Sequence, residues 1–237
     1  MLGPASSPSP VDALGLACGK AHWTALADRV AETAQLAEVP DKAELDPVLD
    51  RLNGRRLVVY GVDAALAAVV QRLLRTSRLE AVAVGFVPLD PSSQVAALWG
   101  LPTVPQQALT LALCGEPERV PLVRDDAGGV LVGLGRLRPL RGVVYCDDQL
   151  VLRGQASVVE VTPDPGAGPD TSKDGLTVRV RRTGLLGRRQ TDTGGRAVQI
   201  GCIPAVVQRD GVPFDRSVDK WTWYRHTQDW RLVRGVL

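Results

Sequence analysis

The sequence is poor in aromatic residues and histidines, and it has no long apolar run. Of its 237 residues, 4% are aromatic, and the two histidines are His22 and His226. Two histidines so far apart in the sequence give little support for a Ser–His–Asp hydrolase. No window holds about 18 uninterrupted apolar residues, so a transmembrane helix is not expected. The N-terminal stretch lacks the basic start and apolar segment of a signal peptide.

The net charge is also small. The chain has 28 basic and 26 acidic residues and a formal charge of +2, which argues against a dedicated nucleic-acid-binding protein or a polybasic membrane clamp. The charge is unevenly divided, because residues 1–120 have 10 basic and 13 acidic side chains, whereas residues 121–237 have 18 and 13. We therefore expect two units with different surfaces, the second leaning weakly toward anionic partners.

The cysteines do not form a recognisable metal or disulfide pattern. Cys18, Cys114, Cys146 and Cys202 lie far apart, without a Cys-x-x-Cys pair, so neither a zinc site nor a disulfide framework is expected. No other constellation of metal ligands stands out. We expect a reducing, cytoplasmic location, with the cysteines acting as small buried hydrophobic side chains.

The N-terminal half alternates apolar runs with helical patterns. Residues 1–20 are expected to form a flexible tail. Helices are expected at residues 22–36, 46–52, 64–76 and 105–114, with a further helix capped by Ser92 or Ser93 and running to Trp99. Buried strands are expected at residues 56–60 and 81–87. This strand–helix–strand–helix order predicts an α/β domain with a parallel, Rossmann-like sheet, which we assign to residues 21–118.

From residue 119 the pattern changes to short β segments separated by turn residues. Strands are expected at residues 120–124, 129–134, 141–145, 150–153, 157–161, 176–182, 196–200, 206–209, 221–224 and 230–233. Residues 163–174 interrupt the series as a loop. Many short strands with turn signals predict an antiparallel β-sandwich domain, residues 119–237. The expected fold class is therefore α+β, with an α/β domain followed by a β-sandwich domain.

Several segments carry a recognisable order and spacing. They read Gly61-Val62-Asp63-Ala64-Ala65, Pro88-Leu89-Asp90-Pro91-Ser92-Ser93-Gln94-Val95-Ala96, Trp99-Gly100-Leu101-Pro102, Gln107-Ala108-Leu109, Val120-Pro121-Leu122-Val123 and Val207-Gln208-Arg209-Asp210-Gly211-Val212-Pro213. Over roughly residues 50–237 the sequence resembles the catalytic domain of the diacylglycerol kinase family, which includes bacterial lipid kinases and is related to NAD kinases. That family's signatures are Gly-Gly-Asp-Gly-Thr, Pro-Leu-Gly-Thr-Gly-Asn-Asp-Phe-Ala and a late Asp-Gly-Glu.

The resemblance implies roles for individual residues. Gly61, Asp63, Ser92 and Ser93 would occupy nucleotide-binding positions, and Asp210 would be the base that takes the proton of the acceptor hydroxyl. An active member would use ATP and Mg²⁺. The family's first strand, with its Asn-Pro motif, has no clear match in residues 1–50.

The two loops depart from the family's pattern at chemically important positions. Glycine allows backbone amides to approach a phosphate closely, often with a positive φ. Val62 and Ala64 replace glycines of the first loop, and Ala65 removes a hydroxyl. Asp90 and Ser92 replace glycines of the second loop, and Asp90 adds negative charge where a phosphate would lie. The sequence thus predicts a degraded ATP site.

The same residues also have structural interpretations. An Asp such as Asp63, directly after a strand, is typical of a helix N-cap, and Asp210-Gly211 between apolar runs is typical of a hairpin turn. Ser92 and Ser93 are expected to be caps rather than nucleophiles. These alternatives stay open at the level of the sequence.

Two surface features are similarly ambiguous. Trp221 and Trp223 lie on one face of a predicted strand, where they form part of the β-sandwich core or else line a lipid cleft between the domains. The arginines of residues 179–189 are expected to form a solvated surface, or else to attract anionic lipid headgroups. They are Arg179, Arg181, Arg182, Arg188 and Arg189.

Three functions are compatible with these observations. The leading hypothesis is a divergent lipid kinase-family protein or pseudoenzyme, with an interdomain cleft for a lipid or a partner. The first alternative is an active ATP-dependent lipid kinase that phosphorylates a diacylglycerol-like hydroxyl using Asp63 and Asp210. The second is a non-catalytic interaction scaffold, which includes a homo-oligomer. Whether the chain is an enzyme is left open.

Overall fold

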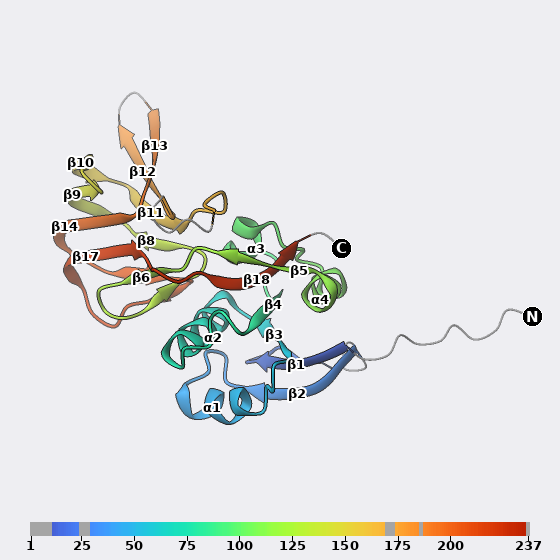
Figure 1. Ribbon diagram of the computed structural model, residues 1–237. Helices are drawn as coiled ribbons and strands as arrows, with labels where there is room; N and C mark the ends of the chain where they lie inside the picture. The colour runs from blue at the N-terminus through green and yellow to red at the C-terminus, as the bar shows by residue number, and fades with distance from the viewer. Residues whose placement is uncertain (1–10, 24–28, 169–173, 185–186, 236–237) are drawn as a thin grey trace, which may run out of the picture.

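A six-stranded mixed sheet forms one half of the molecule (Figure 1). The computed structural model describes residues 11–23, 29–168, 174–184 and 187–235. The sheet has the order β2-β1-β3-β4-β18-β5, in which β5 pairs antiparallel with β18 and the other neighbours are parallel. Its strands are β1 (Val11–Cys18), β2 (Val30–Leu36), β3 (Arg56–Gly61), β4 (Ala83–Pro88), β5 (Glu116–Val120) and β18 (Trp230–Gly235).

Two antiparallel six-stranded sheets form the other half. The first consists of β10 (Gln149–Ala156), β9 (Leu140–Cys146), β14 (Ala197–Ala205), β17 (Val218–Arg225), β6 (Val123–Asp125) and β7 (Val130–Leu131). The second consists of β13 (Gly187–Gly195), β12 (Leu176–Gly184), β11 (Val158–Pro163), β8 (Gly135–Leu137), β15 (Val207–Arg209) and β16 (Val212–Pro213). Both sheets contribute to one core, for example through Val144 and Leu137. The expected α+β fold class is confirmed.

Four helices accompany the mixed sheet within the described residues: α1 (Lys42–Asp50), α2 (Asp63–Arg75), α3 (Gln94–Trp99) and α4 (Pro105–Cys114). Leu66, Val69, Val70 and Leu73 of α2 are buried, because their spacing of three and four residues places them on one face of the helix. They belong to a core that also includes Val130 of the β region. The two halves therefore share apolar packing. Within the described residues, none of the helices has the length and apolar character needed to cross a membrane.

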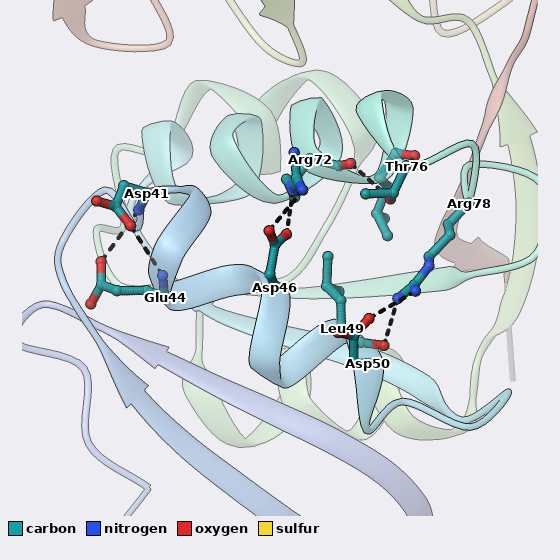
Figure 2. A network of polar contacts seen from close by, with 9 residues as sticks. Asp41, Glu44, Asp46, Leu49, Asp50, Arg72, Thr76 and Arg78 are labelled. Atoms are coloured by element: carbon teal, nitrogen blue, oxygen red, sulfur yellow. Dashed lines mark hydrogen bonds and ion pairs between the residues drawn. The ribbon is translucent and has the colours of Figure 1, made fainter.

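Polar contacts fix α1 against α2 and the turn that follows α2 (Figure 2). A capping box begins α1, because the Asp41 carboxylate accepts from the Glu44 amide at 3.0 Å and Glu44 accepts from the Asp41 amide at 3.3 Å. Asp46 accepts from Arg72 of α2 at 2.8 Å. Arg78 donates to the Leu49 carbonyl oxygen at 2.7 Å. The helix predicted at residues 46–52 is therefore present but begins earlier, at its capping box.

Two expectations for the N-terminal segment are wrong. Residues 11–18 form β1, between β2 and β3, rather than the end of a tail, and residues 30–36 form β2 rather than the second half of the helix expected at residues 22–36. Gly15 allows β1 to lie close to Trp23, since a Cβ there would be 2.8 Å from its ring. The described residues do not include 1–10 of the expected tail, 24–28 of the expected helix, 169–173 of the expected loop or the side chain of Arg188.

The last described strand, β18, lies in the mixed sheet. Figure 1 shows β18 returning from the β region to lie between β4 and β5. Trp230 and Leu232 of β18 are buried in the core shared with α2. Residues 230–235, which belong to the β-sandwich domain expected at residues 119–237, thus lie in the first sheet. The apolar pattern of β18 predicts a strand, but it carries no information about which sheet the strand joins.

Candidate functional site

A cavity of about 260 Å³ lies where the ends of β3 and β4 face the β15–β16 turn. We call it the loop pocket. The residues predicted to bind nucleotide and to act as a base all line it, namely Gly61, Asp63, Ser92, Ser93 and Asp210. Their neighbours in the three loops complete the lining. The structure therefore brings these residues together, although they are up to about 150 positions apart in the sequence.

Asp63 does not cap the helix that it begins. The N-cap of α2 is Val62, which makes no side-chain capping bond. The Asp63 carboxylate instead reaches α3, where it accepts from the amides of Gln94 at 2.8 Å and Val95 at 3.3 Å and from the Ser93 hydroxyl. The interpretation of Asp63 as the cap of its own helix is wrong. Its negative charge lies at the positive end of α3 and satisfies amides that have no partner within the helix.

The second loop has the predicted capping chemistry. Ser93 is the N-cap of α3, and its hydroxyl oxygen accepts from the Ala96 amide at 3.0 Å. Gly100 ends the helix with a φ of +68°, in the left-handed region. Asp90 accepts from both the amide and the hydroxyl of Ser92 at 2.8 Å, and these bonds hold the pKa of Asp90 below its ordinary value. Asp90 is therefore ionised at neutral pH.

The first loop has an ordinary backbone. Val62 is extended, with a φ of −82°, and no residue from 61 to 65 has a positive φ. Gly61 is closely packed, because a Cβ at this position would lie 3.0 Å from the Cβ of Cys18 and 3.1 Å from that of Ala65. The loop therefore tolerates Val62 and Ala64 without strain. It lacks the left-handed glycine conformations that commonly aim amides at a phosphate.

Asp210 combines a turn with a buried carboxylate. Asp210 and Gly211 have φ values of +48° and +88° and join β15 to β16, which confirms the predicted hairpin turn. The Asp210 side chain accepts from the amides of Gly133 at 2.8 Å, Leu134 at 3.0 Å and Val132 at 3.1 Å. These bonds tie the turn to the segment between β7 and β8.

The protonation of Asp210 is shifted toward neutrality. Burial raises the pKa of Asp210 to about 7, the three amide bonds oppose that rise, and the nearby charge of Asp63 adds to it. At neutral pH the carboxyl group is divided between its protonated and ionised forms. Such a pKa suits a proton acceptor, while the amide bonds also give Asp210 a structural role.

The lining of the loop pocket is acidic. Among the described residues it includes the carboxylates of Asp63, Asp90 and Asp210 and no Lys, Arg or His side chain. Carboxylates are able to hold Mg²⁺, but phosphoryl transfer also needs cations that neutralise the phosphates, and this lining supplies no basic side chain for that purpose. Among the residues that the structure describes, no cluster of three His, Cys, Asp or Glu side chains is arranged to hold a metal ion.

Trp221 and Trp223 lie inside the β region. Their exposed fractions are 2% and 0%, and their rings contact each other edge to face at 5.9 Å between centroids. Neither residue lines the loop pocket. The interpretation of these residues as the wall of a lipid cleft is therefore wrong, because the alternation of β17 directs both of them into the core shared by the two antiparallel sheets.

A second cavity, of about 300 Å³, lies between α3 and the outer face of the β8–β11–β12 sheet. We call it the arginine pocket. Arg136, Glu160, Arg179 and Arg181 line it, and Gln94 lines both this pocket and the loop pocket. The sequence indicates a basic surface that includes Arg179 and Arg181, but not a pocket that also contains Arg136 and Glu160. The alternation of Arg179 and Arg181 on one strand is a signal for part of it, but Arg136 lies on β8, and only the strand register places it beside Glu160.

No protein-family model matches this sequence, and no curated protein matches it. Solved structures do. A diacylglycerol kinase from Bacillus anthracis str. Sterne matches with a TM-score of 0.66 and 13% identity, over 94% of this chain and 97% of that chain. An NAD kinase from Archaeoglobus fulgidus in complex with ATP matches with a TM-score of 0.54 and 14% identity, over 94% of both chains. A yeast NADH kinase complexed with NADH matches with a TM-score of 0.51 and 11% identity, over 97% of this chain and 85% of that chain.

The chain has the diacylglycerol kinase fold. The two NAD(H) kinase structures match the same fold with lower TM-scores. The resemblance drawn from the order and spacing of the loops is therefore confirmed for the fold. At identities of 11–14%, the likeness carries no information about activity, which has to be argued from the residues of the site.

Proposed function

We propose that this chain is a pseudoenzyme of the diacylglycerol kinase fold. It does not transfer phosphate from ATP, and it acts by binding a lipid or a partner between its two halves. The observation that carries this proposal is the position of Asp63. Its carboxylate accepts from the first amides of α3 at 2.8 and 3.3 Å, so the donors nearest the loop pocket already have an anionic partner.

The charge around Asp63 supports the same conclusion. A triphosphate entering the loop pocket would have to displace this carboxylate from α3, and it would then face the ionised Asp90. In the part of the chain that the structure describes, no basic side chain of the lining offsets that repulsion. Binding of Mg·ATP is therefore unfavourable at the two loops that would have to hold its phosphates.

Calorimetric titration with Mg·ATP tests the proposal. We expect no saturable heat from the wild-type chain, whereas a diacylglycerol kinase run beside it serves as the positive control. A dissociation constant in the micromolar range would contradict the proposal. The same two proteins, assayed for transfer of labelled phosphate to diacylglycerol, should give transfer with the control alone.

One observation favours a second candidate, an active lipid kinase. The pKa of Asp210 is raised to about 7 in a pocket that faces both halves of the molecule, and a carboxylate of that pKa is able to take a proton from a hydroxyl group. This candidate predicts phosphate transfer to a lipid acceptor by the wild type and none by a folded Asp210→Asn variant. Absence of transfer across a panel of diacylglycerol-like lipids would exclude it.

The cysteines support a cytoplasmic location for this function. Cys18, Cys114, Cys146 and Cys202 are all free thiols, and unpaired cysteines are typical of proteins in a reducing compartment. Mass spectrometry of the protein isolated without reductant tests this point. A native disulfide between any two of the four would contradict it.

A further inference from the structure

The arginine pocket is built from a row of charged side chains on the outer face of a sheet. In the strand register, Glu160 of β11 lies opposite Arg136 of β8 on one side and Arg179 of β12 on the other. Arg181, two residues further along β12, lies on the same face as Arg179. The row thus collects three guanidinium groups from two strands around one carboxylate.

Glu160 orients two of these guanidinium groups. Its side chain is 6% exposed, and its two oxygens contact Arg136 and Arg181, both at 2.9 Å. Arg179 pairs with Asp192 at 2.8 Å instead. A guanidinium has five N–H donors, so these contacts leave each arginine with donors for a ligand. A buried carboxylate that holds two arginines in place reduces the entropy that they lose when an anion binds.

The pocket keeps a net positive charge. Three guanidinium groups face two carboxylates, those of Glu160 and Asp192. Thr162 and Thr177, paired across β11 and β12, add hydroxyl groups to the lining. The adjoining loop pocket is lined by carboxylates without a basic side chain. An anion entering the space around α3 is therefore directed to the arginine pocket.

We infer that the arginine pocket binds a phosphate monoester, carried either by a small soluble molecule or by a lipid headgroup. A phosphate monoester fits because it carries close to two negative charges at neutral pH and three acceptor oxygens, which match forked guanidinium donors. A cavity of about 300 Å³ holds a ligand of the size of a phosphorylated three-carbon unit. This inference rests on the binding role in the proposed function and adds the chemistry of the ligand.

Calorimetric titration of the full chain with glycerol 3-phosphate tests the inference, with inorganic phosphate and uncharged glycerol in parallel. We expect saturable binding of the two phosphates and none of glycerol. The Arg179→Gln/Arg181→Gln variant should bind at least tenfold more weakly. It leaves Glu160 paired with Arg136, so it is expected to fold. Thr177→Val, which removes a hydroxyl without changing the charge, should weaken binding about threefold and serves as the second variant.

Arg189→Gln is the matched control. Arg189 lies opposite Arg182 in the β12–β13 register and so on the other face from Arg179 and Arg181, and its replacement removes one of the positive charges of the same hairpin. We expect its affinity to stay within twofold of the wild type. Equal weakening by Arg189→Gln and by the double variant would overturn the inference, because it would show general attraction to a basic surface. Phosphates that bind no better than glycerol would also overturn it.

Vesicles identify the source of the phosphate. The site is assigned to a lipid headgroup by two results together. The wild type cosediments with phosphatidylcholine vesicles that contain phosphatidate but not with vesicles of phosphatidylcholine alone, and the double variant cosediments with neither. Binding of soluble glycerol 3-phosphate without vesicle binding assigns it to a soluble ligand. Repeating the Mg·ATP titration with the double variant separates the two proposals, because this variant changes the arginine pocket and leaves the lining of the loop pocket intact.

Discussion

Asp210 gives the protein a pH-dependent stability that a single substitution removes. The pKa of Asp210 is raised by burial from an ordinary value of 3.8 to about 7. The folded protein therefore binds this proton more tightly than the unfolded chain does. Its contribution to the free energy of unfolding is fully present below pH 3.8 and is lost as the pH rises through about 7.

The magnitude follows from the width of that window. Between the two pKa values, each pH unit lowers the free energy of unfolding by roughly 1.4 kcal/mol. Asp210→Asn cannot titrate, although it keeps a side-chain oxygen for some of the amide bonds. From pH 5 to pH 8, the free energy of unfolding of the wild type should fall by about 3 kcal/mol relative to that of the variant.

Urea unfolding of both proteins at pH 5, 6, 7 and 8 measures this difference. Other titrating groups, such as His226, whose pKa burial lowers, are common to both proteins and cancel. The free energy of unfolding of the variant should lie furthest below that of the wild type at pH 5 and least far below it at pH 8. A difference that does not change with pH, or a wild type that gains stability over the variant as the pH rises, would refute the reasoning.

Three further predictions follow from the contacts. Asp63→Ala should lower the melting temperature by about 4–8 °C, since it costs roughly 2 kcal/mol in bonds to α3. Asp90→Ala should leave the melting temperature unchanged, because among the described residues the Asp90 carboxylate bonds to the exposed Ser92 alone. Equal effects of the two substitutions would contradict this assignment. In the native protein a thiol reagent should label the exposed Cys114 first and spare Cys18, because burial raises the pKa of Cys18 to about 12; early labelling of Cys18 would count against this order. Trp230→Ala should destabilise the protein by about 3–5 kcal/mol in urea unfolding, because β18 lies inside the mixed sheet, and a variant with wild-type stability would show that it does not.

Local patterns predicted the elements whose signals are local. Ser93 and Gly100 mark the two ends of α3 as predicted, because a capping hydroxyl and a left-handed glycine act within one turn of the helix. The turn at Asp210 was likewise predictable from two neighbouring residues. In contrast, β1 contains alanines and glycine, residues with low strand propensity, and its position is determined by burial between β2 and β3.

Contacts between distant segments could not be predicted from local sequence patterns. The bond from Asp63 to the Gln94 amide joins residues 31 positions apart, so local capping rules assigned the carboxylate to the wrong helix. The arginine pocket depends on the register of β8, β11 and β12, which brings Arg136 and Arg179 to either side of Glu160. The sequence showed that the loop chemistry was altered. The structure adds what the altered residues contact instead.

Thermal unfolding with and without millimolar Mg·ATP tests the central claim most directly. A ligand that binds only the folded state at a hundredfold excess over its dissociation constant stabilises it by about 2.7 kcal/mol, which raises the melting temperature of a chain of this size by several degrees. Because carboxylates line the loop pocket and Asp63 already holds the amides of α3, we predict no shift. A rise of several degrees that persists in the Arg179→Gln/Arg181→Gln variant would show that the loops still hold the phosphates, and it would contradict the account.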